Sequence, residues 1–157
     1  MTSELDELYQ SVILDHNRAP RNFRKLEDAT AHAEGRNPLC GDAFDIWLKV
    51  EGDRISEAAF LGQGCAISKA SASLMTQTIK GKTVAEARRL FDQFHGFVTL
   101  GRVPEGAAAT PPLPAKLEVF RGVRAFPIRV KCATLSWHAM KAALEQSESR
   151  KVGKSEA

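Results

Sequence analysis

The chain has 157 residues, a length that fits one domain around a single hydrophobic core. Hydrophobic residues make up 43% and charged residues 26%, both ordinary for a soluble globular protein. The net charge of +3, with 7% aromatic residues and no basic stripe between aromatics, argues against nucleic-acid binding. No apolar run approaches the roughly 18 residues that span a bilayer, and the acidic N-terminus is unlike a signal peptide. We therefore expect a cytoplasmic protein without a membrane partner.

The first part of the chain is predicted to contain one helix and three strands. The helix ends near residues 16–18, and its apolar residues follow one face: Leu5, Leu8, Tyr9, Val12 and Ile13. His16 is expected to cap this helix or to be exposed. After a loop, strands are predicted at residues 29–35, 44–50 and 54–61, and the turn at 51–53 suits a hairpin.

Helices dominate the rest of the prediction. One helix is expected over residues 65–80, and another begins at Thr83, which has capping-box spacing to Glu86. A loop at 99–114, a short helix at 115–121, an extended segment at 125–131 and a last helix at 132–145 follow. Three serines in the first of these helices are interpreted as small residues for close packing: Ser68, Ser71 and Ser73.

The order of these elements predicts the fold class. Strands grouped before helices indicate an α+β domain with a small three-stranded antiparallel sheet packed against several helices. We expect one domain over residues 1–147, with a Pro/Ala-rich insertion near 99–121 and a polar, frayed tail over 148–157.

The three cysteines are the candidate chemical groups. An odd number of cysteines in a reducing cytosol favours thiol chemistry or metal binding over disulfides. Cys40 lies in a predicted turn, and Cys65 and Cys132 lie at predicted helix N-termini, where a thiolate is stabilised. The turn Cys40-Gly41-Asp42 can aim a thiolate and a carboxylate at one point, and three thiolates with one carboxylate suit zinc, iron or an iron–sulfur cluster. The wide cysteine spacing matches no short zinc motif, so unrelated buried cysteines remain an alternative.

Several local sequences resemble the NifU/IscU-type iron–sulfur assembly family, and its SufU branch in particular. The similar segments keep their order over about residues 5–145 and include PRNF at 20–23, NPLCGD at 37–42, FLGQGCAISKASAS at 60–73 and FPIRVKCATLSW at 126–137, together with residues 8–9, 12–16 and 122–124. Two features favour the SufU branch. Lys131 stands where IscU-type proteins carry a histidine ligand, and residues 99–121 look like an insertion typical of SufU-type proteins.

This resemblance implies a site and a partner. It implies zinc held by Cys40, Asp42, Cys65 and Cys132. It also implies a pyridoxal-phosphate cysteine desulfurase of the SufS type, whose persulfide sulfur passes to Cys40 and then to a downstream scaffold or apo-protein. Arg129 is a further candidate, since it could pair with Asp42. Two alternatives stay open: a scaffold that builds a [2Fe–2S] cluster on the same ligands, and a structural zinc module without sulfur chemistry.

Overall fold

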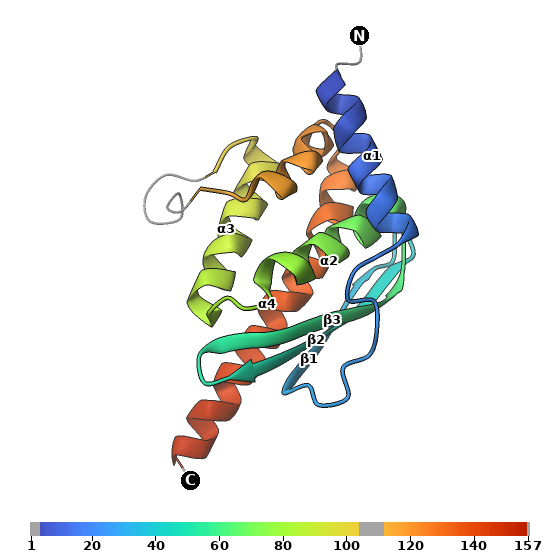
Figure 1. Ribbon diagram of the computed structural model, residues 1–157. Helices are drawn as coiled ribbons and strands as arrows, with labels where there is room; N and C mark the ends of the chain where they lie inside the picture. The colour runs from blue at the N-terminus through green and yellow to red at the C-terminus, as the bar shows by residue number, and fades with distance from the viewer. Residues whose placement is uncertain (1–3, 104–111, 157) are drawn as a thin grey trace.

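A computed structural model describes residues 4–103 and 112–156 (Figure 1). Its elements in chain order are α1 (Glu4–Arg18), β1 (Ala31–Asn37), β2 (Asp42–Glu51), β3 (Arg54–Gln63), α2 (Ala66–Ile79), α3 (Val84–Leu100), the 3-10 helix η2 (Ala115–Ala125) and α4 (Pro127–Glu156). Residues 104–111 of the predicted insertion lie outside the described residues. Within the described part of the chain, no helix has the length and apolar character needed to cross a bilayer.

The three strands form an antiparallel sheet in the order β1-β2-β3, which confirms the predicted fold class. Burial alternates along β2, so that every second side chain, from Asp42 to Val50, points into the interior. Each strand reaches further than predicted at the end nearest Cys40. As a result Asn37, the last residue of β1, pairs with Asp42, the first residue of β2.

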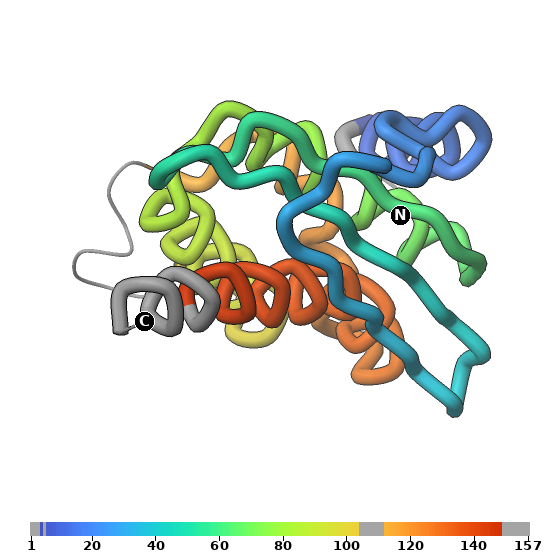
Figure 2. The backbone as a smooth tube through the Cα atoms, turned by 90° about the horizontal axis from the view of Figure 1, so that it is seen from below, coloured from blue at the N-terminus to red at the C-terminus, as the bar shows by residue number. Residues whose placement is uncertain are grey.

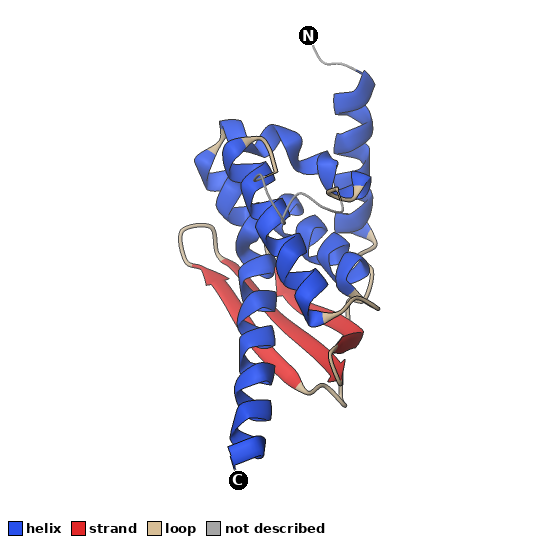
Figure 3. Ribbon diagram, turned by 90° about the vertical axis from the view of Figure 1, so that its left-hand side faces the viewer, coloured by secondary structure: helices blue, strands red, loops and turns tan. Residues whose placement is uncertain are grey.

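The helices gather on one face of the sheet (Figure 3). Here α4 packs against β1 and β2, while α2 packs against β3 and α4. The core between these layers includes Phe44, Phe60, Phe94 and Trp137, each at most 1% exposed. Burial of such large apolar side chains supplies the main stabilisation of the domain.

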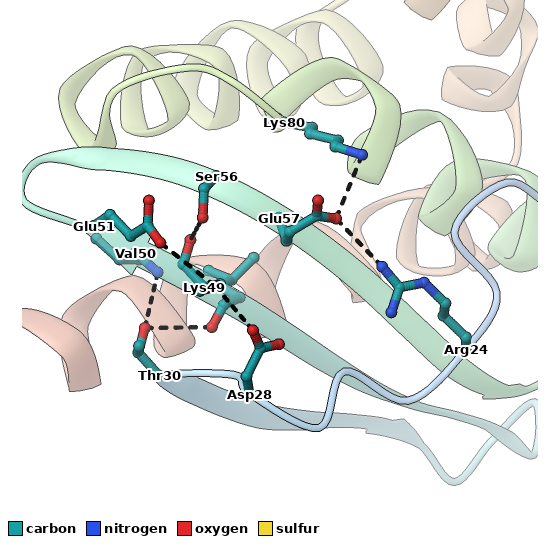
Figure 4. A network of polar contacts seen from close by, with 10 residues as sticks. Arg24, Asp28, Thr30, Lys49, Val50, Glu51, Ser56, Glu57 and Lys80 are labelled. Carbon is teal, nitrogen blue, oxygen red and sulfur yellow. Dashed lines mark hydrogen bonds and ion pairs between the residues drawn. The ribbon is translucent and has the colours of Figure 1, made fainter.

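The opposite face of the sheet carries polar contacts that hold the segment between α1 and β1 (Figure 4). Lys49 forms ion pairs with Asp28 and Glu51, and the Thr30 hydroxyl accepts a hydrogen bond from the Val50 N–H. Because the ion pairs are exposed, each contributes little to stability. This face is the solvated side of the sheet.

The caps of two helices agree with the sequence. Thr83 and Glu86 form the predicted capping box at the start of α3. Cys65 is the N-cap of α2, and its sulfur accepts a hydrogen bond from the Ser68 N–H. Ser71 ties α2 to α4, since its hydroxyl donates to the Ala133 carbonyl and accepts from the indole N–H of Trp137. These contacts fix α2 between the sheet and α4.

The prediction for residues 125–131 was wrong. Instead of an extended segment, α4 begins at Pro127, and it continues to Glu156 through the stretch expected to fray. The alternation of Phe126, Ile128 and Val130 resembles a strand, but proline at the first helical position is pre-organised for a helix. Cys132 therefore lies in the second turn of α4 rather than at its N-terminus.

The prediction for His16 was also wrong, because the side chain is only 6% exposed. Its Nδ1 lies 2.8 Å from the hydroxyl of Ser73 on α2, and the same hydroxyl accepts from the Arg21 N–H. Burial, followed by the charge of Arg21, lowers the pKa of His16. His16 thus anchors α1 to α2 in its neutral form.

Candidate functional site: three thiols and a carboxylate

Three separate segments meet at one end of the molecule: the β1–β2 turn, the β3–α2 junction and the beginning of α4 (Figure 2). Each segment carries one cysteine, and the first also carries Asp42. The three cysteines, far apart in sequence, line a single open cavity of about 430 Å³.

The β1–β2 turn presents Cys40 to solvent. The Asn37 carbonyl accepts hydrogen bonds from the N–H groups of Cys40 and Gly41, at 3.2 and 2.9 Å. Gly41 has a φ of 72°, which glycine adopts without strain. The turn therefore leaves the Cys40 thiol exposed while the next residue but one, Asp42, is 2% exposed.

The β3–α2 junction holds Cys65 and Asp42 together. The Cys65 N–H donates to Asp42 Oδ1 at 3.0 Å, and the Ser68 N–H lies 3.4 Å from the Cys65 sulfur. A glycine is required at position 64 for the backbone to pass so close to Asp42 and Ser68. A Cβ there would come within 2.7 Å of Asp42 Oδ1 and 2.5 Å of the Ser68 hydroxyl. Burial by itself raises the pKa of Cys65, but hydrogen bonds from Ser68 and contact with Cys132 outweigh it, so the pKa is lowered.

Cys132 has the opposite electrostatic environment. Its residue is 2% exposed and lies inside α4, away from the free N–H groups of the helix start. Burial raises the pKa of its thiol well above the usual range, and contacts with Cys65 and Asp42 raise it further. We expected a thiolate stabilised by a helix N-terminus at both cysteines, and only Cys65 fits that expectation.

The donor atoms are close enough to share one ion. Ligand atoms of Cys40, Asp42 and Cys132 all lie within 4.8 Å of one another, and the sulfurs of Cys40 and Cys132 are 4.0 Å apart. Cys65 stands just outside this set, although its thiol contacts Cys132 and lines the same cavity. Asp42 Oδ2 is buried and accepts no hydrogen bond from the described residues. A metal that accepts sulfur and oxygen ligands fits this arrangement, because it would satisfy that oxygen and offset the buried negative charge.

Arg129 and an apolar rim surround the opening. Arg129 lines the cavity, but within the described residues no ion pair joins it to Asp42. Phe126 and Ile128 at the rim are 61% and 63% exposed. Phe126 and Arg129 also border a neighbouring groove of about 550 Å³ between α1, α2 and η2. Exposed apolar side chains around a reactive site are typical of a surface that meets another protein.

Comparison with known proteins agrees with this geometry. The model of the NifU-like N-terminal domain matches residues 8–133. The chain belongs to this family. Among NifU-like relatives, the zinc-dependent sulfurtransferase SufU of Bacillus subtilis is 39% identical over 93% of this chain and 95% of its own.

Other NifU-like relatives carry a different name. The iron–sulfur cluster assembly scaffold protein IscU of Streptococcus pyogenes is also 39% identical, over 92% of this chain and 87% of its own. A solved structure of a candidate iron–sulfur cluster assembly scaffold for the SUF system of Fervidobacterium islandicum superposes with a TM-score of 0.75. It is 33% identical and covers 88% of this chain and 97% of that one.

Sequence reasoning missed two residues of this NifU-like site. Ser68 was interpreted only as a packing residue, although it contacts the Cys65 sulfur with both its N–H and its hydroxyl. Its position three residues after an N-cap cysteine was the available signal. Asn37 was quoted only as part of a motif, and its role in the Cys40 turn depends on a strand register that the sequence does not reveal.

Proposed function

We propose that this member of the iron–sulfur cluster assembly family is a zinc-dependent sulfur acceptor. It takes sulfur from the persulfide of a pyridoxal-phosphate cysteine desulfurase and passes it on for cluster assembly. The observation that carries this proposal is the exposed Cys40 thiol grouped with buried Asp42 and buried Cys132. The name of the Bacillus subtilis relative supports the same reading.

Zinc would be held by Cys40, Asp42, Cys65 and Cys132, and when bound it would keep the thiolates deprotonated while reducing their reactivity. Of these residues, Cys40 is the one that a partner can reach, because it is exposed on a turn. Cys65 is held by Ser68 and Cys132 is buried in α4, so both would stay in place. The site thus separates one movable thiol from two anchored ones.

The transfer step needs no oxidant. The Cys40 thiolate attacks the outer sulfur of the desulfurase persulfide, and the sulfur–sulfur bond to the desulfurase cysteine breaks. That cysteine leaves as a thiolate, while Cys40 becomes the persulfide and any proton on the outer sulfur stays with it. Arg129 beside the cavity would favour the anionic sulfur species, and the apolar rim would contact the desulfurase.

Replacement Cys40→Ala tests the proposal with purified desulfurase. We expect this variant to stimulate the desulfurase no longer. In mass spectrometry, the peptide that contains residue 40 should no longer gain the mass of one sulfur atom. Leu39→Ala is a matched control on the same turn, since Leu39 is 81% exposed and has no thiol. It should keep the sulfur label. Undiminished stimulation by Cys40→Ala would overturn the proposal.

A second candidate function is a scaffold on which a [2Fe–2S] cluster is built. It is favoured by the scaffold names of the Streptococcus pyogenes and Fervidobacterium relatives. Anaerobic reconstitution with iron and sulfide, followed by transfer to an apo-ferredoxin, distinguishes the two. A coloured protein that transfers its cluster supports the scaffold, whereas a colourless protein that retains zinc supports the sulfur acceptor.

A further inference from the structure

Asn37 carries a buried hydrogen-bond donor beside the thiol site. The residue is 8% exposed and is the last residue of β1. Its Oδ1 accepts from the Leu39 N–H at 3.2 Å, which fixes the orientation of the amide because a nitrogen there could not accept. The other end of the amide, Nδ2, is buried and has no partner among the described residues. Buried donors are rarely left unpaired, so this one calls for an acceptor.

Asp42 on the neighbouring strand carries a candidate acceptor. Asn37 and Asp42 are register partners across β1 and β2, so both side chains lie on the helix-covered face of the sheet. Cross-strand partners have their Cβ atoms about 4.5–5.5 Å apart, within reach of an amide and a carboxylate. Asp42 Oδ1 is held by the Cys65 N–H, while Oδ2 is buried and accepts no hydrogen bond within the described part of the chain. Register partners of one strand pair therefore carry a buried donor and a buried acceptor that have no partner among the described residues.

The net charge of the site with metal bound would explain a buried hydrogen-bond donor at Asn37. Three thiolates and one carboxylate outweigh a divalent metal, so the site keeps a net negative charge in a partly buried place. On the Cys65 side, Ser68 donates to the sulfur. The amide of Asn37 is the corresponding buried donor on the side of Asp42.

The geometry points to Asn37 as a positioning residue that donates from Nδ2 to Asp42 Oδ2 when metal is bound. This inference rests on the metal site of the proposed function. With Oδ1 held by the Cys65 N–H and Oδ2 by Asn37, the carboxylate would keep one orientation, and each oxygen would retain a lone pair for the metal. Residues that orient a metal-ligating carboxylate typically change metal affinity by about 10–100-fold when they are replaced.

A double-mutant cycle on zinc affinity tests the inference. Zinc affinity is measured by chelator competition for the wild-type protein, Asn37→Ala, Asp42→Ala and the double variant. We expect Asn37→Ala to weaken zinc binding by about 10–100-fold in the wild-type background. In the Asp42→Ala background it should weaken binding by no more than about 2-fold, since the interaction is already lost. An equal loss in both backgrounds would overturn the inference, because Asn37 would then act through the Cys40 turn. No loss in the wild-type background would overturn it as well.

Two further measurements separate this role from folding of the turn. Asn37→Ser keeps an oxygen that can accept from the Leu39 N–H but is too short to reach Asp42, so it should lose affinity as Asn37→Ala does. The visible spectrum of the cobalt-loaded protein should shift in Asn37→Ser but not when the same change is made in Asp42→Ala. An Asn37→Ser variant with wild-type affinity and spectrum contradicts the inference. A wild-type protein that binds no zinc would overturn both proposals, whereas zinc binding without sulfur transfer would overturn the proposed function alone.

Discussion

The α2 end and the α4 end of the thiol site are built differently. At the α2 end, Cys65 caps the helix and its sulfur receives a hydrogen bond from the Ser68 N–H, next to a glycine that no larger residue could replace without a clash. At the α4 end, Cys132 is buried inside the helix and lacks such donors among its described contacts. The fold therefore favours the thiolate at Cys65, whose pKa is lowered, and disfavours it at Cys132, whose pKa is raised. The two cysteines of one site thus lie in opposite electrostatic environments.

The largest expected effect of this contrast is on thiol reactivity in the metal-free protein. Because the pKa of Cys65 is lowered and that of Cys132 is raised, Cys65 should be alkylated at lower pH and much faster. Each pKa unit between two thiols corresponds to about a tenfold difference in thiolate fraction. Iodoacetamide labelling across a pH series, with peptide mapping, measures both rates.

Two controls sharpen the labelling experiment. In denaturant the two cysteines should react alike, because the fold creates the difference. Ser68→Ala removes the hydroxyl near the Cys65 sulfur, so labelling of Cys65 should move to higher pH. Equal rates for Cys65 and Cys132 in the folded protein would contradict the proposed contrast.

The next effect concerns Gly64 at the α2 end. In Gly64→Ala the new methyl group would lie 2.7 Å from Asp42 Oδ1 and 2.5 Å from the Ser68 hydroxyl. Relief of this overlap should lower the free energy of unfolding by about 1–3 kcal/mol and weaken zinc binding, since Asp42 must move. Denaturant unfolding and chelator competition measure the two losses.

Gly122 provides the matched control for Gly64. It is exposed in η2, and an added Cβ there would meet no atom within 4 Å. Gly122→Ala should therefore leave zinc affinity unchanged. If Gly64→Ala behaved in the same way, the close packing around Asp42 and Ser68 would not be important for the site.

The contrast between the two ends also shows what the sequence could predict. Gly62-Gln63-Gly64 breaks the pattern of a strand just before a helical one, so local signals were enough to place Cys65 at a helix start. Around Cys132 the local signals conflicted, because alternating apolar residues suggested an extended segment while Pro127 favoured a helix. The pairing of Asn37 with Asp42 depends on strand ends, which are the least certain part of such a prediction. Local motifs and family resemblance thus predicted that the three cysteines and Asp42 lie together, but not the contacts around them.

The smallest expected effect concerns the anchoring of α2 by His16. Its pKa is lowered in the folded protein by burial, then by Arg21 and Lys116, against the opposing charge of Asp15. Well above pH 6.5, the ordinary pKa of histidine, His16 is neutral in both the folded and the unfolded state, so no stability is lost. As the pH falls below this value, the unfolded chain binds a proton that the folded chain resists, and the free energy of unfolding falls until the lowered folded pKa is passed.

Urea unfolding of the wild-type protein and of His16→Gln, measured between neutral pH and pH 5, isolates the contribution of His16 to the pH dependence of stability. The pKa of His138 is also lowered, by burial first and then by the charges of His95 and Lys141, so His138→Gln is needed as a parallel control. We expect each variant to remove part of the pH dependence. Because His16 contacts Ser73 on α2 and His138 lies on α4, only His16→Gln should also alter the labelling rate of Cys65. An unchanged pH dependence in His16→Gln would show that protonation of this buried histidine does not weaken the fold, which would contradict the prediction.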